Sequence, residues 1–191
     1  MDRKLHKLCV FCGSSFGQGE KYLNKTQELG RYMAENSIEL IYGGGNVGLM
    51  GELARTVLKG GGKVIGVIPK KIYENVQHVE LTQLYIVEDM HERKAKMYSL
   101  ADGFIGLPGG IGTLEEVSEI YTWYQLGYHK KPIGLLNIEN FYDPFLKLLQ
   151  HMIKEDFLDE AYLQALAIEK EPKVLIKAME SHEPFYHKKW K

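Results

Sequence analysis

The chain lacks the features that mark membrane, secreted and nucleic-acid-binding proteins. No apolar run approaches the roughly 18 residues of a membrane-spanning helix, and no signal-peptide stretch follows the first residues. The net charge is only −1, so no excess of basic residues points to a nucleic-acid partner. We therefore expect a cytoplasmic protein that binds neither membranes nor nucleic acids.

Cysteine is scarce as well. The chain has two, Cys9 and Cys12, three residues apart in one predicted strand, so their side chains point to opposite faces and cannot easily form a disulfide. No second Cys/His pair follows at zinc-finger spacing. We expect two buried thiols in a reducing compartment, no metal site and no cofactor.

Glycine, in contrast, is plentiful, with 20 residues in a chain of 191, and it gathers where predicted strands end. Apolar runs predict strands at residues 8–12, 40–42, 64–68, 85–87, 104–107, 132–136 and 165–168. Amphipathic stretches predict helices at residues 20–36, up to 59, 90–101, after 112, from 143 and from 172. This alternation is typical of an α/β fold. We expect a doubly wound, Rossmann-like parallel sheet with helices on both faces, as a single domain over residues 1–191.

Two segments fit none of these elements. Residues 69–83 are polar and irregular, and their length is that of a mobile active-site loop. The tail, residues 182–191, is basic and aromatic, and we expect it to pack loosely or on a partner subunit.

The sequence LPGGIGTLEE at residues 107–116 joins a predicted strand to a predicted helix. Glycines 109, 110 and 112 let the backbone approach a ligand, and the first N–H groups of the helix are free to bind an anion. Such a turn is a natural phosphate site.

The residues that follow the glycines carry oxygen atoms. Thr113 can cap the helix or contact a ligand. We expect Glu115 and Glu116 in the first turn, where they either complement the helix dipole or, in one case, face bound substrate.

Two further glycine-rich exits, residues 13–17 and 43–51, follow predicted strands, and all three exits should meet at one edge of a parallel sheet. Residues 43–48 fit a dinucleotide fingerprint poorly, because no acidic residue ends the next strand. Cradling a single phosphate is the better interpretation. The alternative, glycines needed only for tight turns, explains one exit better than three.

A charged cluster, MHERKAK, occupies residues 90–96. Arg93 and Lys94 could clamp a phosphate or orient a leaving group. The alternative is an exposed helix face on which Glu92 and Lys96 form an i,i+4 pair.

The motif PGGxGTxxE at residues 108–116, preceded by MHERK at residues 90–94, resembles the LONELY GUY family of cytokinin riboside 5′-monophosphate phosphoribohydrolases, long mislabelled as lysine decarboxylases. Further segments resemble the family in the same order: FCGSS at 11–15, YGGG at 42–45, VGLMG at 47–51 and TWxQLG at 122–127. The likeness spans nearly the whole chain.

The resemblance implies a doubly wound fold, a homodimer and hydrolysis of the N-glycosidic bond of AMP or an N6-substituted adenosine 5′-monophosphate, with release of the base and ribose 5-phosphate. By motif position it implies Arg93 and Glu116 as the catalytic pair. The substrate-binding positions that we expect are Lys94, Gly109, Gly110, Ile111, Gly112, Thr113, Leu114, Glu115, Thr122, Gly43, Gly44 and Glu74. Glu74 stands in a loop whose length differs from that of the family.

The residues agree with this chemistry. Breaking the C1′–N9 bond creates an oxocarbenium-like ribose, and a carboxylate such as Glu116 stabilises that charge or activates water. A different class of function stays open: a nucleotide-binding module that senses its ligand without turnover.

Aromatic residues crowd the helix after the glycine turn, at positions 121, 123, 124 and 128. One helix face cannot bury all of them, so we expect some at a subunit contact. The alternative is that residues 132–155 cover them within one chain.

Overall fold

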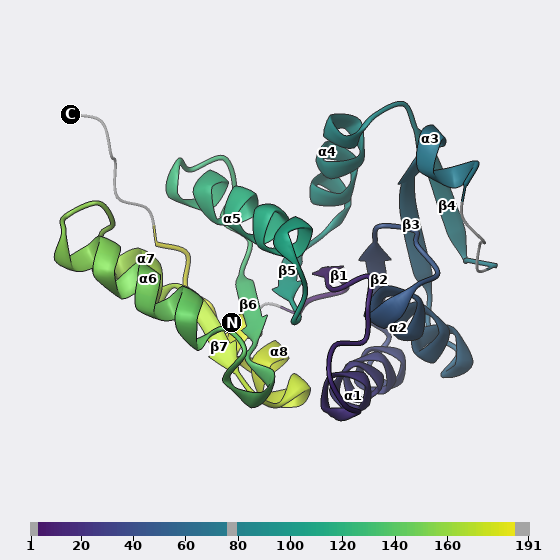
Figure 1. Cartoon of the computed structure of the whole chain (residues 1–191), viewed down its shortest axis with the longest axis horizontal. Coiled ribbons are helices and arrows are strands. Elements are labelled where there is room, and N and C mark those ends of the chain that lie inside the picture. The colour runs from purple at the N-terminus through teal and green to yellow at the C-terminus, as the bar shows by residue number, and fades with distance from the viewer. Residues whose placement is uncertain (1–3, 76–79, 186–191) are drawn as a thin grey trace.

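A computed structural model describes residues 4–75 and 80–185, and its centre is a parallel β-sheet (Figure 1). The strands are β1 (Lys7–Phe11), β2 (Glu39–Tyr42), β3 (Val64–Pro69), β4 (Gln83–Val87), β5 (Gly103–Gly106), β6 (Ile133–Leu136) and β7 (Leu166–Glu169). Within the described residues they form one seven-stranded sheet in the order β4-β3-β2-β1-β5-β6-β7, and every neighbouring pair is parallel.

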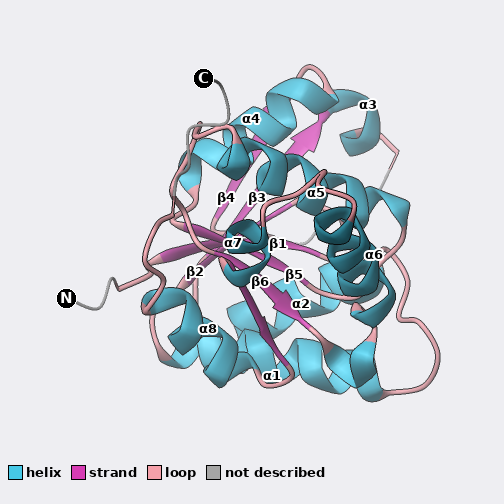
Figure 2. Cartoon of the chain, turned by 90° about the vertical axis from the view of Figure 1, so that its left-hand side faces the viewer, coloured by secondary structure: helices cyan, strands magenta, loops and turns pink. Residues whose placement is uncertain are grey.

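Helices cover both faces of this sheet (Figures 1 and 2). They are α1 (Lys21–Glu35), α2 (Gly48–Lys59), α3 (Lys70–Tyr73), α4 (Met90–Leu100), α5 (Ile111–Gln125), α6 (Asp143–Lys154), α7 (Glu160–Gln164) and α8 (Pro172–Glu180), with a 3₁₀ turn at Ile138–Asn140. Helices α1, α2 and α8 pack on one face, and α4 to α7 pack on the other. The predicted doubly wound α/β fold is confirmed.

The two core layers follow from the alternation of side chains along β1. Leu8 and Val10 belong to the layer under α1, α2 and α8, whereas Cys9 and Phe11 belong to the layer under α4 and α5. Cys12 returns to the first layer, so the two free, buried thiols lie on opposite faces, as the spacing predicted.

The strand order reverses direction between β1 and β5, because the chain runs outward from β1 through β2 to β4 and then crosses back to β5. Ligands bind at such a switch point, beyond the carboxyl ends of the strands. The three glycine-rich exits lie there. The Gly13 N–H donates to Pro108 O at 3.1 Å, and the Leu49 N–H donates to Gly13 O at 3.1 Å, so backbone hydrogen bonds join the three loops.

Two sequence expectations need correction. Residues 69–83 are not wholly irregular, because residues 70–73 form the short helix α3; residues 76–79 lie outside the described residues. In the tail, the described part packs on its own chain: the Phe185 N–H donates to Tyr124 Oη at 2.9 Å, and the His182 ring contacts that same hydroxyl. Residues 186–191 lie outside the described residues.

None of the helices in the described residues is long and apolar enough to cross a membrane.

Candidate active site

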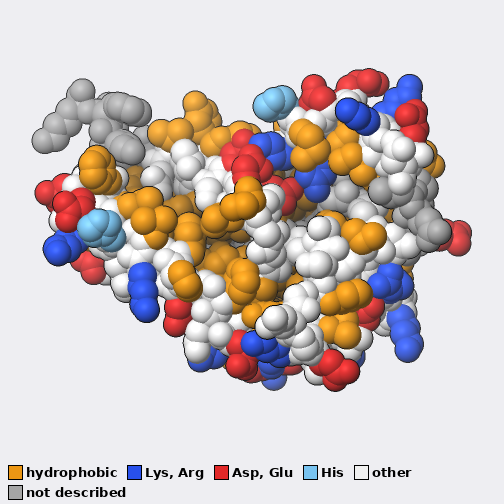
Figure 3. Space-filling view, viewed as in Figure 1, with side chains coloured by type: hydrophobic (Ala, Val, Ile, Leu, Met, Phe, Trp, Pro, Cys, Tyr) orange, Lys and Arg blue, Asp and Glu red, His pale blue; other side chains and the backbone are white. Residues whose placement is uncertain are grey.

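A cavity of about 440 Å³ opens at the switch point, where the three glycine-rich loops meet the start of α4. Its size lies within the roughly 300–1,000 Å³ of small-molecule sites. It is lined by Cys12, Gly13, Ser14, Gly43, Gly45, Asn46, Val47, Met50, Ile72, Met90, Arg93, Gly110, Ile111, Gly112, Thr113, Glu115 and Glu116. Figure 3 shows acidic and basic side chains together between α5 and α4, bordered by apolar ones.

Three helices begin at this cavity, and their first turns differ in charge. Helix α4 is capped, because the Asp89 carboxylate accepts the Glu92 N–H at 2.8 Å, and Glu92 adds a second carboxylate. Helices α2 and α5 begin after Val47 and Gly110, which make no capping hydrogen bond, and neither first turn contains an acidic residue. In the first turn of α2 the Leu49 N–H already donates to Gly13 O, so it is chiefly the first N–H groups of α5 that make this cavity attractive to an anion.

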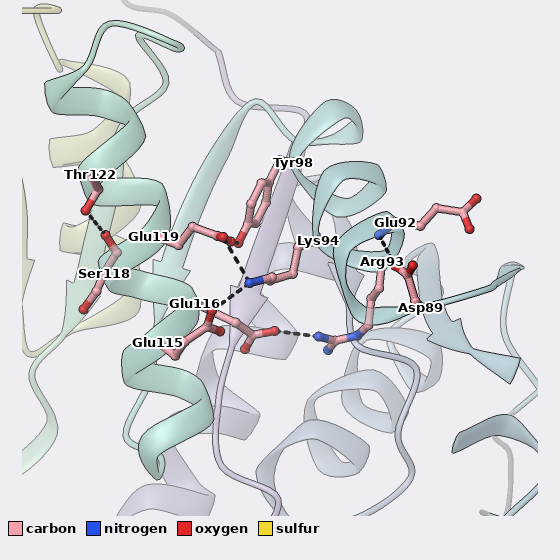
Figure 4. Close-up of polar contacts among 10 residues, drawn as sticks. All are labelled: Asp89, Glu92, Arg93, Lys94, Tyr98, Glu115, Glu116, Ser118, Glu119 and Thr122. Atoms are coloured by element: carbon pink, nitrogen blue, oxygen red, sulfur yellow. Dashed lines mark hydrogen bonds and ion pairs between the residues drawn. The ribbon is translucent and has the colours of Figure 1, made fainter. Parts of the chain in front are cut away.

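Arg93 crosses the cavity wall from α4 and is only 8% exposed. Its Nη1 donates to Glu116 Oε1 on α5 at 2.7 Å, and its Nε donates to the carbonyl oxygen of Val67 at 3.2 Å. Gly43 leaves room for Nη2, since a Cβ atom there would collide with it. The guanidinium is thus held in one orientation, with its charge paired to a single carboxylate (Figure 4).

Glu116 is a largely buried carboxylate, its side chain 13% exposed, and it forms an ion pair with Arg93. Burial raises its pKa above the ordinary glutamate value, and Glu115 raises it further, while Arg93 and Lys94 oppose this. A carboxylate whose pKa is raised by an enclosed, partly apolar site is a candidate for acid–base or charge-stabilising chemistry.

Lys94, the next residue on α4, makes a second bridge to α5. Its ammonium contacts Glu115 Oε1 at 2.7 Å and Glu119 Oε1 at 3.0 Å (Figure 4). The Tyr98 hydroxyl donates to the other oxygen of Glu119 at 2.5 Å. The α4–α5 seam therefore carries three ion pairs in the described residues: Arg93–Glu116 and Lys94–Glu115 at the cavity, and Lys94–Glu119 behind it.

Comparisons with known proteins identify the family. The family model described as "Possible lysine decarboxylase" matches residues 50–179. The chain is 44% identical over 184 residues to the cytokinin riboside 5′-monophosphate phosphoribohydrolase LOG of Oryza sativa subsp. japonica, covering 96% of this chain and 76% of that protein. It is 41% identical to LOG1 of Arabidopsis thaliana, covering 98% and 89%. The chain belongs to the LONELY GUY family.

Solved structures share the fold at lower identity. The molybdenum cofactor binding protein of Rippkaea orientalis gives a TM-score of 0.69 at 22% identity, covering 93% of this chain and 97% of that one. The molybdenum cofactor carrier protein of Chlamydomonas reinhardtii gives 0.67 at 18%, covering 92% and 95%. The LONELY GUY fold is thus shared with proteins of different function, and the site has to carry the functional argument.

Most residues that resemble LONELY GUY motif positions meet at the cavity. Those that line it are Arg93, Glu116, Gly43, Gly110, Ile111, Gly112, Thr113 and Glu115. Lys94 reaches the cavity through its contact with Glu115. Gly109 and Gly44 shape the turns beside it: a Cβ atom at 109 would collide with Thr113, and Gly44 has a φ of +76°. Leu114 is half-buried in the first turn of α5.

Two predicted substrate contacts stand apart from the lining. Thr122 is exposed almost two turns beyond Glu116, and its hydroxyl donates to the Ser118 carbonyl oxygen at 2.7 Å (Figure 4). Glu74 is exposed at the end of α3, whereas Ile72 of that helix lines the cavity.

Local expectations around α5 and α4 were partly wrong. Helix α5 begins at Ile111, so Glu115 and Glu116 lie in its second turn, and Gly110 rather than Thr113 is the N-cap residue. Glu92 does not pair with Lys96: its carboxylate accepts the Glu88 N–H at 2.8 Å, and the Lys96 ammonium lies 4.3 Å from the Tyr85 ring centroid. Arg93 is buried and not on an exposed face.

The predicted contacts left out most of the apolar border of the cavity and the second bridge. Of the exposed apolar residues on the lining, Ile111 was predicted, whereas Val47, Ile72 and Met90 were not. Glu119 reaches Lys94 and Tyr98 only because α4 and α5 lie side by side, and no short spacing in the sequence signals such a contact.

Proposed function

We propose that this protein hydrolyses the N-glycosidic bond of AMP or of N6-substituted adenosine 5′-monophosphates, the cytokinin riboside 5′-monophosphates, and releases the free base and ribose 5-phosphate. The observation that carries the proposal is the largely buried Arg93–Glu116 pair in a cavity where two helices begin without a side-chain cap. Relatives at 41–44% identity are named as phosphoribohydrolases for this class of substrate.

The 5′-phosphate binds at the start of α5 in this proposal. The N–H groups around Gly110 to Thr113 are the first donors of an uncapped helix, and the buried Thr113 hydroxyl lies on the same wall. Two or three such donors hold a phosphate without a metal ion. Gly109 and Leu114 complete this turn, and Gly43 and Gly44 bring the second loop close to the ligand.

Glu116 acts on the ribose. As the C1′–N9 bond breaks, positive charge develops on the sugar, and a preorganised carboxylate stabilises it or takes a proton from the attacking water. The water supplies the hydroxyl group at C1′, and the departing base takes a proton. The enclosed position of Glu116 strengthens either effect, because little solvent screens its charge.

Arg93 holds Glu116 and stands where it can also contact the departing base or the phosphate. Its Nη1 is engaged by Glu116 and its Nε by Val67 O, so Nη2 beside Gly43 is the group directed to a ligand. Glu115, half-exposed on the lining, is placed to accept hydrogen bonds from ribose hydroxyls, and Lys94 balances its charge.

The apolar side chains at the cavity are consistent with a substrate whose base carries an apolar substituent. The cavity, with its charged residues at the base, is bordered by Met90, Ile111, Val47 and Ile72. Glu74 and Thr122 do not line the cavity. We propose both as outer contacts, which reach the substrate only when further parts of the complete site bring it to them.

The deciding experiment is incubation with AMP and with an N6-isopentenyl-adenosine 5′-monophosphate, followed by chromatography for free base and ribose 5-phosphate. Equimolar base and sugar phosphate support the proposal. Tight binding of either nucleotide without release of base would favour the alternative, a sensing module, which the shared fold of cofactor-binding proteins makes a reasonable competitor.

We also propose a homodimer that works in the cytoplasm. Helix α5 and the turn after it leave Tyr128 76% exposed beside the half-buried Trp123, over a second hollow of about 550 Å³ between α4 and α5. Tyr121 and Tyr124, by contrast, are buried within one chain. The remaining aromatic surface is of the kind found at subunit contacts. Two free, buried thiols are consistent with a reducing compartment.

A further inference from the structure

Two side-chain donors hold the Glu119 carboxylate, one at each oxygen. Its Oε1 accepts from Lys94 Nζ at 3.0 Å, and its Oε2 accepts from the Tyr98 hydroxyl at 2.5 Å (Figure 4). Tyr98 is buried, packs edge-on against Trp123 with ring centroids 4.9 Å apart, and is itself fixed. Neither Glu119 nor Tyr98 is among the described residues that line the active-site cavity.

Glu115, the other carboxylate that contacts Lys94, differs from Glu119 in each of these respects. Glu115 lines the cavity, its side chain is 51% exposed, and among the described residues its one side-chain hydrogen bond is that to Lys94 at 2.7 Å. The Glu119 side chain is 25% exposed and has two donors. A half-exposed carboxylate with one partner can exchange that partner for a ligand, whereas a doubly held one stays in place.

Lys94 itself needs a permanent partner. Its side chain is only 11% exposed, so its ammonium has lost part of its water, and a desolvated charge without a counter-charge is unfavourable. If Glu115 turned toward a ligand and nothing else held the ammonium, Lys94 would move out to solvent. The α4–α5 seam would then lose the bridge that lies beside the Arg93–Glu116 pair.

We propose that Glu119, braced by Tyr98, is a positioning residue that retains Lys94 between α4 and α5, so that Glu115 is free to leave Lys94 for a bound ligand. The consequence for catalysis, which rests on the proposed function, is that the seam keeps its spacing during turnover. Arg93 and Glu116, one residue from Lys94 and Glu115 along their helices, then keep their 2.7 Å contact while Glu115 changes partner.

The accessibility of the Lys94 amine tests this directly and without any enzyme assay. Brief acetylation of the folded protein, followed by digestion and mass spectrometry, gives a rate for each lysine. Lys96 on the same helix is the internal control, because it lies over the Tyr85 ring and away from both glutamates. We compare the wild type with Glu119→Gln, Glu115→Gln and Tyr98→Phe.

We expect Glu119→Gln to accelerate acetylation of Lys94 by about fivefold or more relative to Lys96, since loss of the retained counter-charge lowers the lysine pKa and frees the amine. Tyr98→Phe should give a smaller increase, and Glu115→Gln the smallest. The proposal is overturned if Lys94 stays protected in Glu119→Gln, or if Glu115→Gln exposes it more than Glu119→Gln does.

Ribose 5-phosphate, used as a probe, distinguishes anchoring of Lys94 by Glu119 from simple packing of the Lys94 side chain. In the wild type, saturation with it should leave Lys94 protected, while in Glu119→Gln it should expose Lys94 further, because Glu115 has moved to the sugar. If Glu119→Gln binds the probe with unaltered affinity but its rate of Lys94 acetylation does not change, the exchange of Glu115 from Lys94 to the ligand is refuted.

Turnover supplies the second readout. If the wild type releases base from AMP, Glu119→Gln should lower kcat about tenfold with a smaller change in KM, and this loss should shrink in a Lys94→Met background, since Glu119 acts through Lys94. Equal losses in both backgrounds would contradict a role through Lys94. A wild type without turnover would refute the proposed function. The acetylation rates would still show whether Glu119 anchors Lys94.

Discussion

The guanidinium of Arg93 occupies the space into which a side chain at residue 43 would project, and residue 43 is a glycine. The same guanidinium donates to the Val67 carbonyl oxygen and to Glu116. Its position is thus set by three elements besides its own helix: strand β3, the loop after β2, and α5. A change at any one of them should move the charge that, in the proposed mechanism, faces the substrate.

Gly43→Ala isolates this relationship. Residue 43 does not have a positive φ, so alanine introduces no backbone strain, only a methyl group that displaces Nη2. We expect kcat/KM to fall on the order of a hundredfold, the cost of misplacing a catalytic group by about 1 Å. The loss should largely disappear in an Arg93→Ala background. A fully active Gly43→Ala enzyme would mean that Nη2 has no part in turnover.

Glu116→Gln should nearly abolish turnover while the fold persists. The amide keeps the shape of the side chain but removes the charge that stabilises the ribosyl cation, and loss of one such contact costs about a hundredfold or more. Glu88→Gln, in the exposed loop before α4, is the matched control. Activity within about threefold of the wild type would exclude Glu116 from the mechanism.

Substrates without the phosphate should be far poorer. If the first turn of α5 binds the 5′-phosphate, its binding energy positions the scissile bond, and adenosine loses that contribution in kcat as well as in KM. Steady-state kinetics with AMP and adenosine measure the difference. Equal kcat/KM for the two would remove the argument for an anion site at α5.

The acid limb of the pH profile should report Glu116. The proposed mechanism needs the carboxylate, and burial raises its pKa, so activity should be lost as the pH falls through a value above the ordinary glutamate range. Glu115→Gln removes a neighbouring negative charge, lowers the pKa of Glu116 and should move the limb to lower pH. Lys94→Met removes a positive charge and should move it to higher pH. Shifts in the same direction would show that another group controls the limb.

Assembly should depend on the exposed aromatic surface after α5. We expect a dimer by light scattering and a fall in specific activity on dilution toward monomer. Tyr128→Glu places a charge in that surface and should weaken the dimer, whereas Phe157→Glu, at another highly exposed aromatic beyond α6, serves as the control. A wild type that is monomeric and fully active at micromolar concentration would contradict the homodimer.

Much of the fold was predictable because its signals are local. Each strand is a short apolar run, and the glycines after β1, β2 and β5 mark turns that must meet at one edge of a parallel sheet. The order of elements, including the strand Leu166–Glu169 and the helix from Pro172, follows from such patterns.

The contacts across α4 and α5 were not predictable, because they depend on how two helices face each other. The spacing of Glu92 and Lys96 predicted an i,i+4 pair. In the structure Glu92 instead accepts a hydrogen bond from the backbone before the helix, and Lys96 lies over the Tyr85 ring. Burial of Arg93 and the double hold on Glu119 likewise arise only when the sheet brings the two helices together. The start of α5 at Ile111, two residues before Thr113, shifted both glutamates into the second turn.

The starts of α2 and α5, which have no side-chain cap, carry an evolutionary consequence. The attraction for phosphate comes from main-chain N–H groups, which every residue except proline supplies, so no ordinary point substitution removes it. In the mechanism proposed above, turnover by contrast depends on one carboxylate, that of Glu116. On that mechanism a variant without Glu116 would keep its nucleotide and cease to cleave it, and so a receptor for the substrate would lie a single mutation away from the enzyme.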